Sequence, residues 1–392
     1  METFVKIINN LINEAAMQGK FFTFIPFILI LFFFCSKQDG TYTIEIKDGV
    51  RHVLNNAPLW GDEPKVALEF VQKIGELDTE DENYMLYRAN DVALDIDGNI
   101  YILDAGNYCV KKYDKQGKYL ATIGRKGQGP GEFEFPVSID LDTDGNIYLA
   151  DISNNRILVL LSNGKEMRTF KIGKRVSAFK LLPSGDILTG NTGGASFLSI
   201  SNRNQEFNQP VVKIYDTEGN LKSEFGKPFD FKDIAFNTVG NKIYFTFDWD
   251  NNMYICFAYQ NRVEKYSLEG KLSFTADRLL NYDISRPKSS MEEVSGGGYM
   301  IRMPKINVVS DGIGIDYKGR IWVMTYLKQR EKDNPEIFLK LEIYSNDGIL
   351  LGEIPWSEDF TPAKNSIHMF GYRVFFFDFE GTSVYEYKIV EK

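Results

Sequence analysis

The chain has 392 residues, of which 43% are hydrophobic and 14% aromatic, and a formal net charge of −9. A single large all-β unit can reach this length, and the 30 Phe and 21 Tyr residues suit pleated, half-buried sheets. Only 13 Pro and no long polar tract exclude a mainly disordered chain. The chain lacks the basic balance of proteins that bind a phosphate backbone, so nucleic acid is not an expected partner.

The N-terminal segment contains an apolar run over residues 21–34, preceded by Lys20. This run is too short to span a bilayer, which takes about 20 residues, but it is typical of the hydrophobic region of a signal peptide. Residues 1–35 are therefore predicted to be an export signal. Translation begins either at Met1 or at Met17, because the residues from Met17 to the apolar run make a more ordinary signal start.

Cys35 directly follows the apolar run and precedes Ser36, Lys37 and Gln38. This order resembles a bacterial lipoprotein signal, in which the cysteine is lipidated and becomes the mature N-terminus. Phe34 departs from the pattern, because such signals place a small residue before the cysteine. Cys35 is expected to be a lipidation site, the alternative being a plain anchor or cleaved signal with an incidental cysteine. Membrane contact is expected only through this lipid or anchor.

A hairpin repeat organises the rest of the chain. Residues 95–104 recur in nearly the same form at 142–151, each with Asp-Gly-Asn between apolar runs. This is a strong hairpin signal, because Gly tolerates positive φ. Weaker copies make a total of six first turns, the others lying at residues 183–188, 250–255, 317–322 and 370–375.

A second turn follows five of the six copies, at residues 115–118, 162–165, 217–220, 268–271 and 346–349. The sixth copy ends after residues 383–390, one strand short. Residues 66–75, near the other end of the chain, read like the missing fourth strand. The sequence therefore predicts an all-β, six-bladed β-propeller over residues 66–391, closed by an N-terminal strand that completes the last blade. Residues 36–65 are predicted as an N-terminal linker and lead-in strand, and a β-sandwich is the alternative fold.

A family resemblance adds to this interpretation. Residues 123–133 (IGRKGQGPGEF), followed by Pro136, residues 144–148 and residues 151–157, resemble the NHL-repeat pattern. More narrowly, the chain resembles six-bladed β-propeller lipoproteins of Gram-negative envelopes, sharply over residues 90–172 and diffusely beyond. The resemblance implies the fold and a place in the bacterial cell envelope, either lipid-anchored to a membrane or periplasmic and surface-exposed. For most members of the family it implies no reaction.

Long insertions are predicted on one face of the disc. Loops between strands two and three of a blade open on the same face as the connections between blades, whereas the hairpin turns lie on the opposite face. Turn residues such as Asp97, Asn99, Asp144 and Asn146 are therefore expected to be structural. The insertions are expected either to bind a glycan, a peptide or an envelope protein, or simply to cover the disc; they are residues 125–135, 191–209, 278–305 and 329–338.

Five residues are candidate ligand contacts. Asn90, Asp91 and Asp311 are expected near the mouth of the central channel. Arg125 lies in the loop that joins blades one and two, and Arg156 is expected at the same face. The alternative for Arg156 is a side chain that ties down a tight turn.

A calcium-dependent hydrolase or lactonase is the alternative function, since some six-bladed propellers hold a metal in the channel. Such a site needs converging oxygen ligands, whereas the channel positions offer two acids and one lysine among Asn90, Asp91, Ser138, Ser177, Tyr244, Asp311 and Lys364. No cofactor is therefore expected, and calcium is the one to test. The chain has only two histidines, His52 and His368. Neither a zinc site nor a Ser-His-Asp triad is therefore expected. His368 is expected to be a packed core residue, and the chain a binding or scaffold protein.

The two remaining cysteines lie in different blades, Cys109 in blade one and Cys256 in blade four. These blades stand on opposite sides of a six-fold ring. A disulfide needs Cα atoms within about 7 Å of each other, so the two thiols are predicted to stay unpaired.

Overall fold

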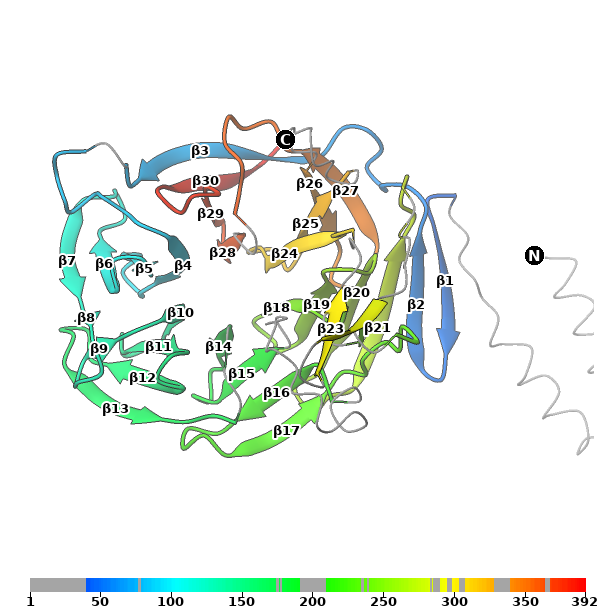
Figure 1. Cartoon of the computed structure of the whole chain (residues 1–392). Coiled ribbons are helices and arrows are strands. Elements are labelled where there is room, and N and C mark those ends of the chain that lie inside the picture. Colours follow the sequence, from blue (N-terminus) through cyan, green and yellow to red (C-terminus); the bar gives the residue numbers. More distant parts are fainter. Residues whose placement is uncertain are drawn as a thin grey trace, which may run out of the picture.

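The computed structural model describes residues 40–392 with internal gaps at 77–78, 174–175, 177, 191–208, 234–235, 238–239, 283, 285–289, 295–297, 303–306, 328–338 and 364–366. In this part of the chain, six sheets stand around a central axis (Figure 1). The arrangement is the all-β, six-bladed propeller that the sequence predicts, with the blades in the predicted order.

Blades one to three are consecutive four-stranded antiparallel meanders. Blade one consists of β4 (Ala89–Leu94), β5 (Ile100–Asp104), β6 (Cys109–Tyr113) and β7 (Tyr119–Ile123). Blade two consists of β10 (Pro136–Leu141), β11 (Ile147–Asp151), β12 (Arg156–Leu160) and β13 (Glu166–Phe170). Blade three consists of β14 (Phe179–Leu181), β15 (Ile187–Gly190), β16 (Val212–Tyr215) and β17 (Leu221–Phe225).

Blades four and five repeat this plan. Blade four consists of β18 (Ile243–Phe247), β19 (Met253–Phe257), β20 (Arg262–Tyr266) and β21 (Leu272–Arg278). Blade five consists of β24 (Ser310–Ile315), β25 (Ile321–Tyr326), β26 (Leu339–Tyr344) and β27 (Leu350–Pro355). Two short pairs lie in the connections between blades, namely β8 (Arg125–Lys126) with β9 (Glu132–Phe133) and β22 (Ser290–Val294) with β23 (Gly298–Arg302).

Blade six takes its strands from both ends of the propeller. Its inner strands are β28 (His368–Phe370), β29 (Arg373–Phe377) and β30 (Val384–Glu391), and its outer strand is β3 (Val66–Ile74). β3 pairs antiparallel with β30 from Val66 opposite Glu391 to Ile74 opposite Val384. The ring is thereby closed through backbone hydrogen bonds between segments far apart in the sequence.

The N-terminal residues form a belt along the outside of blades four, five and six. β1 (Tyr42–Lys47) and β2 (Val50–Asn55) form a hairpin, and β2 pairs in parallel with β21, so blade four becomes a six-stranded sheet. The Asn55 amide then donates to the Gly348 carbonyl of blade five at 3.0 Å, and the backbone N–H groups of Leu59 and Trp60 donate to β27. The sequence predicts a linker and a lead-in strand over residues 36–65. In the described part of this segment the structure has two strands, β1 and β2, and further hydrogen bonds to blade five.

The hydrophobic core is divided into six wedges, each between two neighbouring blades. In the wedge between blades one and two, Leu103 and Val110 come from one sheet, and Ile139 and Leu149 from the other. Because both faces of each blade are covered, second strands such as β5 and β11 are buried along their whole length. This explains why their sequences are continuous apolar runs.

A leading aspartate holds the first turn in several blades. In blade four, the Asp248 carboxylate accepts hydrogen bonds from the backbone of Asp250 and Asn252, from the Asn252 amide and from the Tyr254 hydroxyl. The side chain thereby satisfies several donors of the turn at once. Equivalent carboxylates hold the turns of blades one, two and five, namely Asp95, Asp142 and Asp316.

The structural role expected of the turn residues holds for Asn99 and Asn146, whose amides donate to the leading aspartates at 2.8 Å. Asp97 and Asp144 donate to the same aspartates through their backbone N–H groups, and their side chains are exposed. The side chain next to the turn glycine is therefore not required for the shape of the turn.

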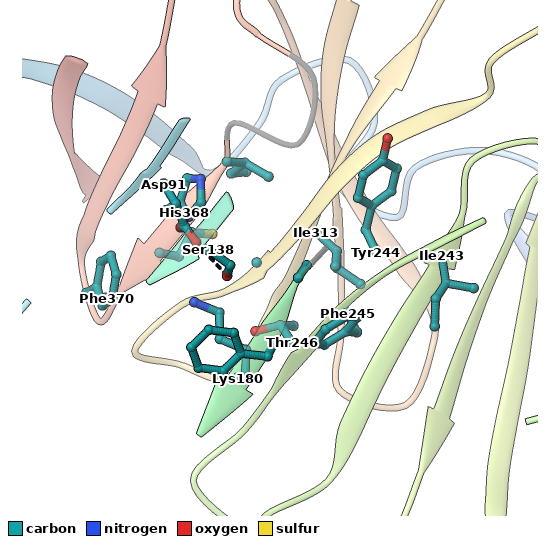
Figure 2. A pocket seen from close by; sticks show the side chains of 15 residues that line it. Asp91, Ser138, Lys180, Ile243, Tyr244, Phe245, Thr246, Ile313, His368 and Phe370 are labelled. Carbon is teal, nitrogen blue, oxygen red and sulfur yellow. Dashed lines mark hydrogen bonds and ion pairs between the residues drawn. The ribbon is translucent and has the colours of Figure 1, made fainter. Parts of the chain in front are cut away.

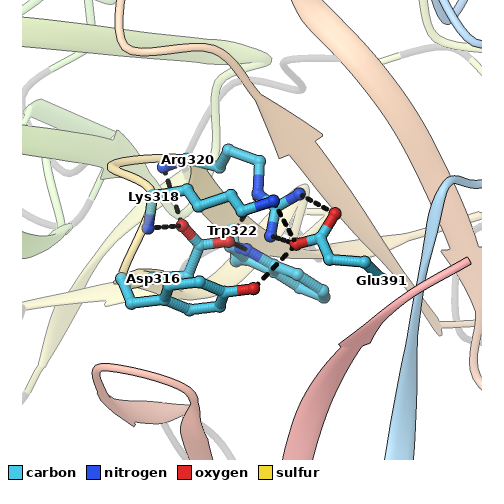
Figure 3. A network of polar contacts seen from close by, with 6 residues as sticks. Asp316, Lys318, Arg320, Trp322 and Glu391 are labelled. Carbon is cyan, nitrogen blue, oxygen red and sulfur yellow. Dashed lines mark hydrogen bonds and ion pairs between the residues drawn. The ribbon is translucent and has the colours of Figure 1, made fainter.

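An ion-pair network ties blade five to blade six (Figure 3). The Arg320 guanidinium lies 2.6 Å from Asp316 Oδ2 and 2.8 Å from Glu391 Oε1, at the end of β30. Glu391 also accepts a hydrogen bond from the Tyr317 hydroxyl at 2.9 Å, and Lys318 Nζ lies 3.0 Å away. The hydrogen bond from Arg320, with smaller contributions from Lys318 and Tyr317, lowers the pKa of Glu391 to about 2.

Asp248→Ala is expected to lower the free energy of unfolding by about 1–3 kcal/mol, because several turn donors lose their acceptor. Asp250→Ala, in the same turn, is the matched control and is expected to change stability by less than about 0.5 kcal/mol. Urea unfolding followed by circular dichroism measures both values. Equal losses in the two variants would contradict the role assigned to the leading aspartate.

The Glu391 network predicts a pH dependence. A carboxylate whose pKa is lower in the folded than in the unfolded protein stabilises the fold above its unfolded value of 4.5, and this contribution is lost as the pH falls towards about 2. Because Glu391 is partly exposed, Glu391→Gln is expected to cost only about 0.5–1 kcal/mol at pH 7. The difference in free energy of unfolding between the wild type and Glu391→Gln should become smaller as the pH is lowered from 7 to 4 and to 2.5. A difference that stays constant over these three pH values would refute the role of the Glu391 carboxylate.

Candidate functional site

A cavity of about 70 Å³ lies in the central channel, where residues of all six blades meet (Figure 2). Every inner strand contributes to its wall. The polar side chains come from five blades, and the wall includes Asp91, Ser138, Lys180, Tyr244, Thr246 and His368. The channel therefore brings together polar side chains that are far apart in the sequence.

Asp91 is the centre of the polar wall. Its Oδ2 accepts hydrogen bonds from the Ser138 hydroxyl at 2.8 Å and from the Ile139 N–H at 2.9 Å. Its Oδ1 accepts the Val92 N–H at 2.9 Å and lies 3.3 Å from His368 Nδ1. One buried carboxylate thus links blades six, one and two, and both of its oxygens are engaged.

His368 lies on the channel wall, where its ring meets the edge of Phe377 at a centroid distance of 5.4 Å. The sequence analysis expects a packed core residue, and the ring is indeed largely buried, but it also faces Asp91 in the channel. The order is hydroxyl, carboxylate, imidazole, with Asp91 between Ser138 and His368. A serine nucleophile needs contact with its base, and this arrangement does not provide that contact.

Lys180 lies on the neighbouring part of the wall, and its charge is influenced by Asp140, a carboxylate of β10 that does not line the cavity. Asp140 accepts the Leu181 N–H at 2.9 Å, and burial raises the pKa of its carboxyl. Burial alone would lower the pKa of Lys180, but Asp140 and Asp91 outweigh it and raise that pKa. The Lys180 ammonium therefore stays charged as it points into the channel (Figure 2).

Of the predicted channel positions that the structure describes, Asp91, Ser138 and Tyr244 line the cavity, and Asn90 and Asp311 do not. Asp91 lines the cavity, whereas Asn90, next to it in β4, is exposed and does not line it. Asp311 is buried between blades four and five, where it accepts hydrogen bonds from the Tyr244 hydroxyl at 2.5 Å and the Tyr326 hydroxyl at 2.9 Å. Asp311 therefore joins two blades through tyrosines.

The two predicted arginines lie away from the channel, at the loop 125–135. The Arg125 side chain is 81% exposed and donates to Glu132 Oε1 at 2.8 Å. Arg156 donates to the Glu132 carbonyl at 2.5 Å, and its Nε lies 3.6 Å from Asp151. Arg156 thus holds the loop against blade two, which corresponds to the turn-tying alternative.

Other residues singled out in the sequence lie outside the described residues. These are Cys35, Ser177, Lys364, residues 191–208 and 329–338, and parts of the insertion 278–305. Of the five predicted site residues that the structure describes, only Asp91 lines the cavity. The sequence analysis did not single out Lys180 and expected His368 only as a packed core residue. Both belong to inner strands immediately before a first turn, and their place on the channel wall depends on closure of the ring.

The described residues do not supply a metal cage. Among them, no group of three or more His, Cys, Asp and Glu side chains lies close enough to hold an ion. Asp91 is already saturated by donors, so the described wall does not fit the converging oxygen ligands that calcium requires.

Within the described ranges, no helix has the length and apolar character to cross a membrane.

The two described cysteines are unpaired, as predicted, and both are buried. Burial raises the pKa of the Cys109 and Cys256 thiols to about 12. Thiols of this kind are not ionised near neutral pH, so neither is suited to act as a nucleophile.

Asp91→Ala is expected to lower the free energy of unfolding by about 2–4 kcal/mol, because the Ser138 hydroxyl and the Ile139 N–H would be buried without an acceptor. The neighbouring exposed residue supplies the control, and Asn90→Ala is expected to change stability by less than about 0.5 kcal/mol. Chemical unfolding of the two variants measures the difference. A neutral Asp91→Ala would contradict the structural role of this carboxylate.

The chain matches one family of known propellers in sequence and several solved structures in fold. The model of the family DUF5128, described as a 6-bladed beta-propeller, matches residues 68–283. No curated protein sequence matches the chain. A DUF4221 family member from Bacteroides vulgatus is 10% identical with a TM-score of 0.57, and the match covers 84% of this chain and 99% of the other. A Bacteroides fragilis protein named as exported is 12% identical with a TM-score of 0.55, covering 87% and 99%.

A gluconolactonase from Xanthomonas campestris is also similar, with 12% identity, a TM-score of 0.46 and coverage of 78% and 87%. At these identities the likenesses concern the fold alone. The TM-score of the gluconolactonase is too low for its activity to bear on this chain.

Proposed function

Since the chain belongs to the DUF5128 family of six-bladed β-propellers, we propose that it is an exported, lipid-anchored binding or scaffold module of the cell envelope. The observation that carries the proposal is the chemistry of the channel. Its cavity of about 70 Å³ is small beside the roughly 300–1,000 Å³ of ordinary ligand sites. Its central carboxylate is occupied by structural donors. A partner is therefore to be sought at the faces of the disc.

Export and anchoring rest on the N-terminal sequence. The apolar run 21–34 followed by Cys35 supports a lipoprotein signal in residues 1–35. A structural neighbour named as exported, from Bacteroides fragilis, has the same fold. The NHL-repeat pattern over residues 90–172 supports membership of the envelope lipoproteins that carry such repeats.

Cys35→Ala is expected to abolish incorporation of a fatty-acid label and to release the protein from the membrane fraction, because the acylated sulfur would be lost. Metabolic labelling with an alkyne fatty acid in a Gram-negative host, followed by fractionation, measures both effects. Cys109→Ala, which changes a buried thiol, is the control and is expected to keep the label. A labelled Cys35→Ala protein would refute the anchor.

A hydrolase is the second candidate, favoured by one observation. The Asp91–His368 pair faces a cavity, and a carboxylate that orients an imidazole is a common device of general-base catalysis. In the form that the sequence suggests, such an enzyme would depend on calcium. The pair is compatible with that activity but lacks the nucleophile contact described above.

Calcium separates the two candidates. A native site filled at 100 times its dissociation constant stabilises the protein by about 2.7 kcal/mol, which raises the melting temperature by roughly several degrees. For a binding module we expect no difference between the melting temperatures with calcium and with chelator. A rise of that size, together with ester or lactone hydrolysis that His368→Ala abolishes, would favour the enzyme.

A further inference from the structure

The six first turns surround one mouth of the channel, on the face opposite to the long insertions. Two hydrogen bonds show that turns of successive blades touch. The Tyr317 N–H of blade five donates to the Gly371 carbonyl of blade six at 3.1 Å. Arg373 of blade six donates to the Gly98 carbonyl of blade one at 2.9 Å. The turns of blades five, six and one therefore form one continuous surface.

Large apolar side chains are exposed on the turns of blades five, six and one and also on the turn of blade four. Ile96 is 93% exposed, Trp249 81%, Tyr372 58% and Tyr317 42%. Ile96, Trp249 and Tyr317 each directly follow the leading aspartate of their turn, a position whose side chain takes no part in the turn hydrogen bonds. The Tyr317 hydroxyl donates to Glu391 of blade six, so that ring also has a structural contact. The exposure of Ile96 and Trp249 is not explained by the turn hydrogen bonds, and exposed apolar surface of this kind marks interaction sites.

The same turns present negative charge. The carboxylates of Asp97 and Asp250 are exposed and directly follow Ile96 and Trp249 in sequence, and Asp144 is exposed on the turn of blade two. The basic side chains of the six turns are engaged with acids, as Lys318 pairs with Glu391, Arg320 with Asp316 and Arg373 with Glu386. We call the acidic and apolar surface the turn rim, and define it by Ile96, Asp97, Trp249, Asp250, Tyr317 and Tyr372.

We propose that the turn rim is a docking surface for a partner protein that presents clustered Arg or Lys side chains. Aromatic faces attract cations through their negative quadrupole, and adjacent carboxylates form charge-assisted hydrogen bonds with guanidinium groups. Trp249 followed by Asp250 supplies both elements within two residues. The charge of the rim matches the net charge of −9 of the whole chain, so a basic partner is favoured at long range as well.

The path of the N-terminus is consistent with such a partner, and this step rests on the proposed lipid anchor. Tyr42 pairs with Asn55, which pairs in turn with Arg278 at the end of β21 on the insertion face. The stretch from Cys35 to Tyr42 is seven residues long and spans at most about 25 Å. An anchor at Cys35 would hold this edge near the bilayer and leave the turn rim facing away from it.

The test uses the full-length protein in detergent and a fluorescent dodecapeptide of alternating Arg and Gly, followed by fluorescence anisotropy. The proposal expects binding that weakens at least about tenfold between 50 and 500 mM salt, because screening reduces attraction between exposed charges. A dodecapeptide of alternating Glu and Gly is expected not to bind.

Two rim variants locate the contact. Trp249→Ala and the double variant Asp97→Asn with Asp250→Asn are each expected to weaken binding about threefold to tenfold, because they remove the aromatic face or two of the exposed carboxylates, one in blade one and one in blade four. Leu221→Ala and Met167→Ala are matched controls, since these apolar side chains are similarly exposed, 50% and 56%, but lie on outer strands. They are expected to bind the peptide as the wild type does.

Three results would overturn the proposal: rim variants that bind as tightly as wild type, equal binding of the Arg and Glu peptides, or a salt-independent preference of the rim for neutral glycans. Self-association that the rim variants abolish would instead assign the surface to a second copy of this chain, and would also overturn it. Peptide binding that persists in the rim variants would leave a binding module with its site elsewhere. Peptide binding is measured in parallel on the Cys35→Ala protein. Because this variant changes the proposed anchor and leaves the turn rim intact, its binding tests docking independently of anchoring.

Discussion

The pairing of β3 with β30 is the constraint on which the rest of the structure depends. It joins Val66 to Glu391 and thereby fixes blade six between blades five and one. A propeller blade cannot bury both faces without two neighbours, so an open ring would leave one wedge of the core exposed, with one bare face on each of the two blades that flank it. The channel wall depends on the same closure, because Asp91 belongs to blade one and His368 to blade six. Ring closure thus creates both the last part of the core and the polar centre of the channel.

Charged groups inside the ring serve mainly to join blades. Arg278 of blade four lies 2.6 Å from Glu342 of blade five, and both side chains are almost completely buried. Burial would raise the pKa of Glu342, but Arg278 and Lys340 outweigh it and lower that pKa. Asp311 and Asp91 form comparable links through hydroxyl and backbone donors. Removing one partner of such a pair is costly, because the other is left buried and unpaired.

The two faces of the disc differ for a related reason. On the turn face, the leading aspartates satisfy the hydrogen bonds of the turns, so the turn itself does not need the side chain of the next residue. In blade five that residue, Tyr317, contacts Glu391 of blade six instead. On the other face, the loop 125–135 is held by Arg156 and by the fully buried Phe133. Two residues expected to contact ligands, Arg125 and Arg156, therefore frame a packed loop. The exposed aromatic and acidic groups gather on the face that the sequence analysis regarded as structural.

The sequence by itself determined the number of blades, their order and the segment that supplies the closing strand. These features follow from local chemistry: hairpin turns have characteristic residues, and a missing turn can be counted. Tertiary structure alone decided which side chains meet, as with Asp91 and His368 across the seam or Asp311 between Tyr244 and Tyr326. It also decided the parallel pairing of β2 with β21, because these strands are far apart in the sequence and no hairpin turn between them indicates the pairing. The physical reason is that each environment is made by a neighbouring blade, whose residues are distant in sequence and whose approach is set by sheet packing.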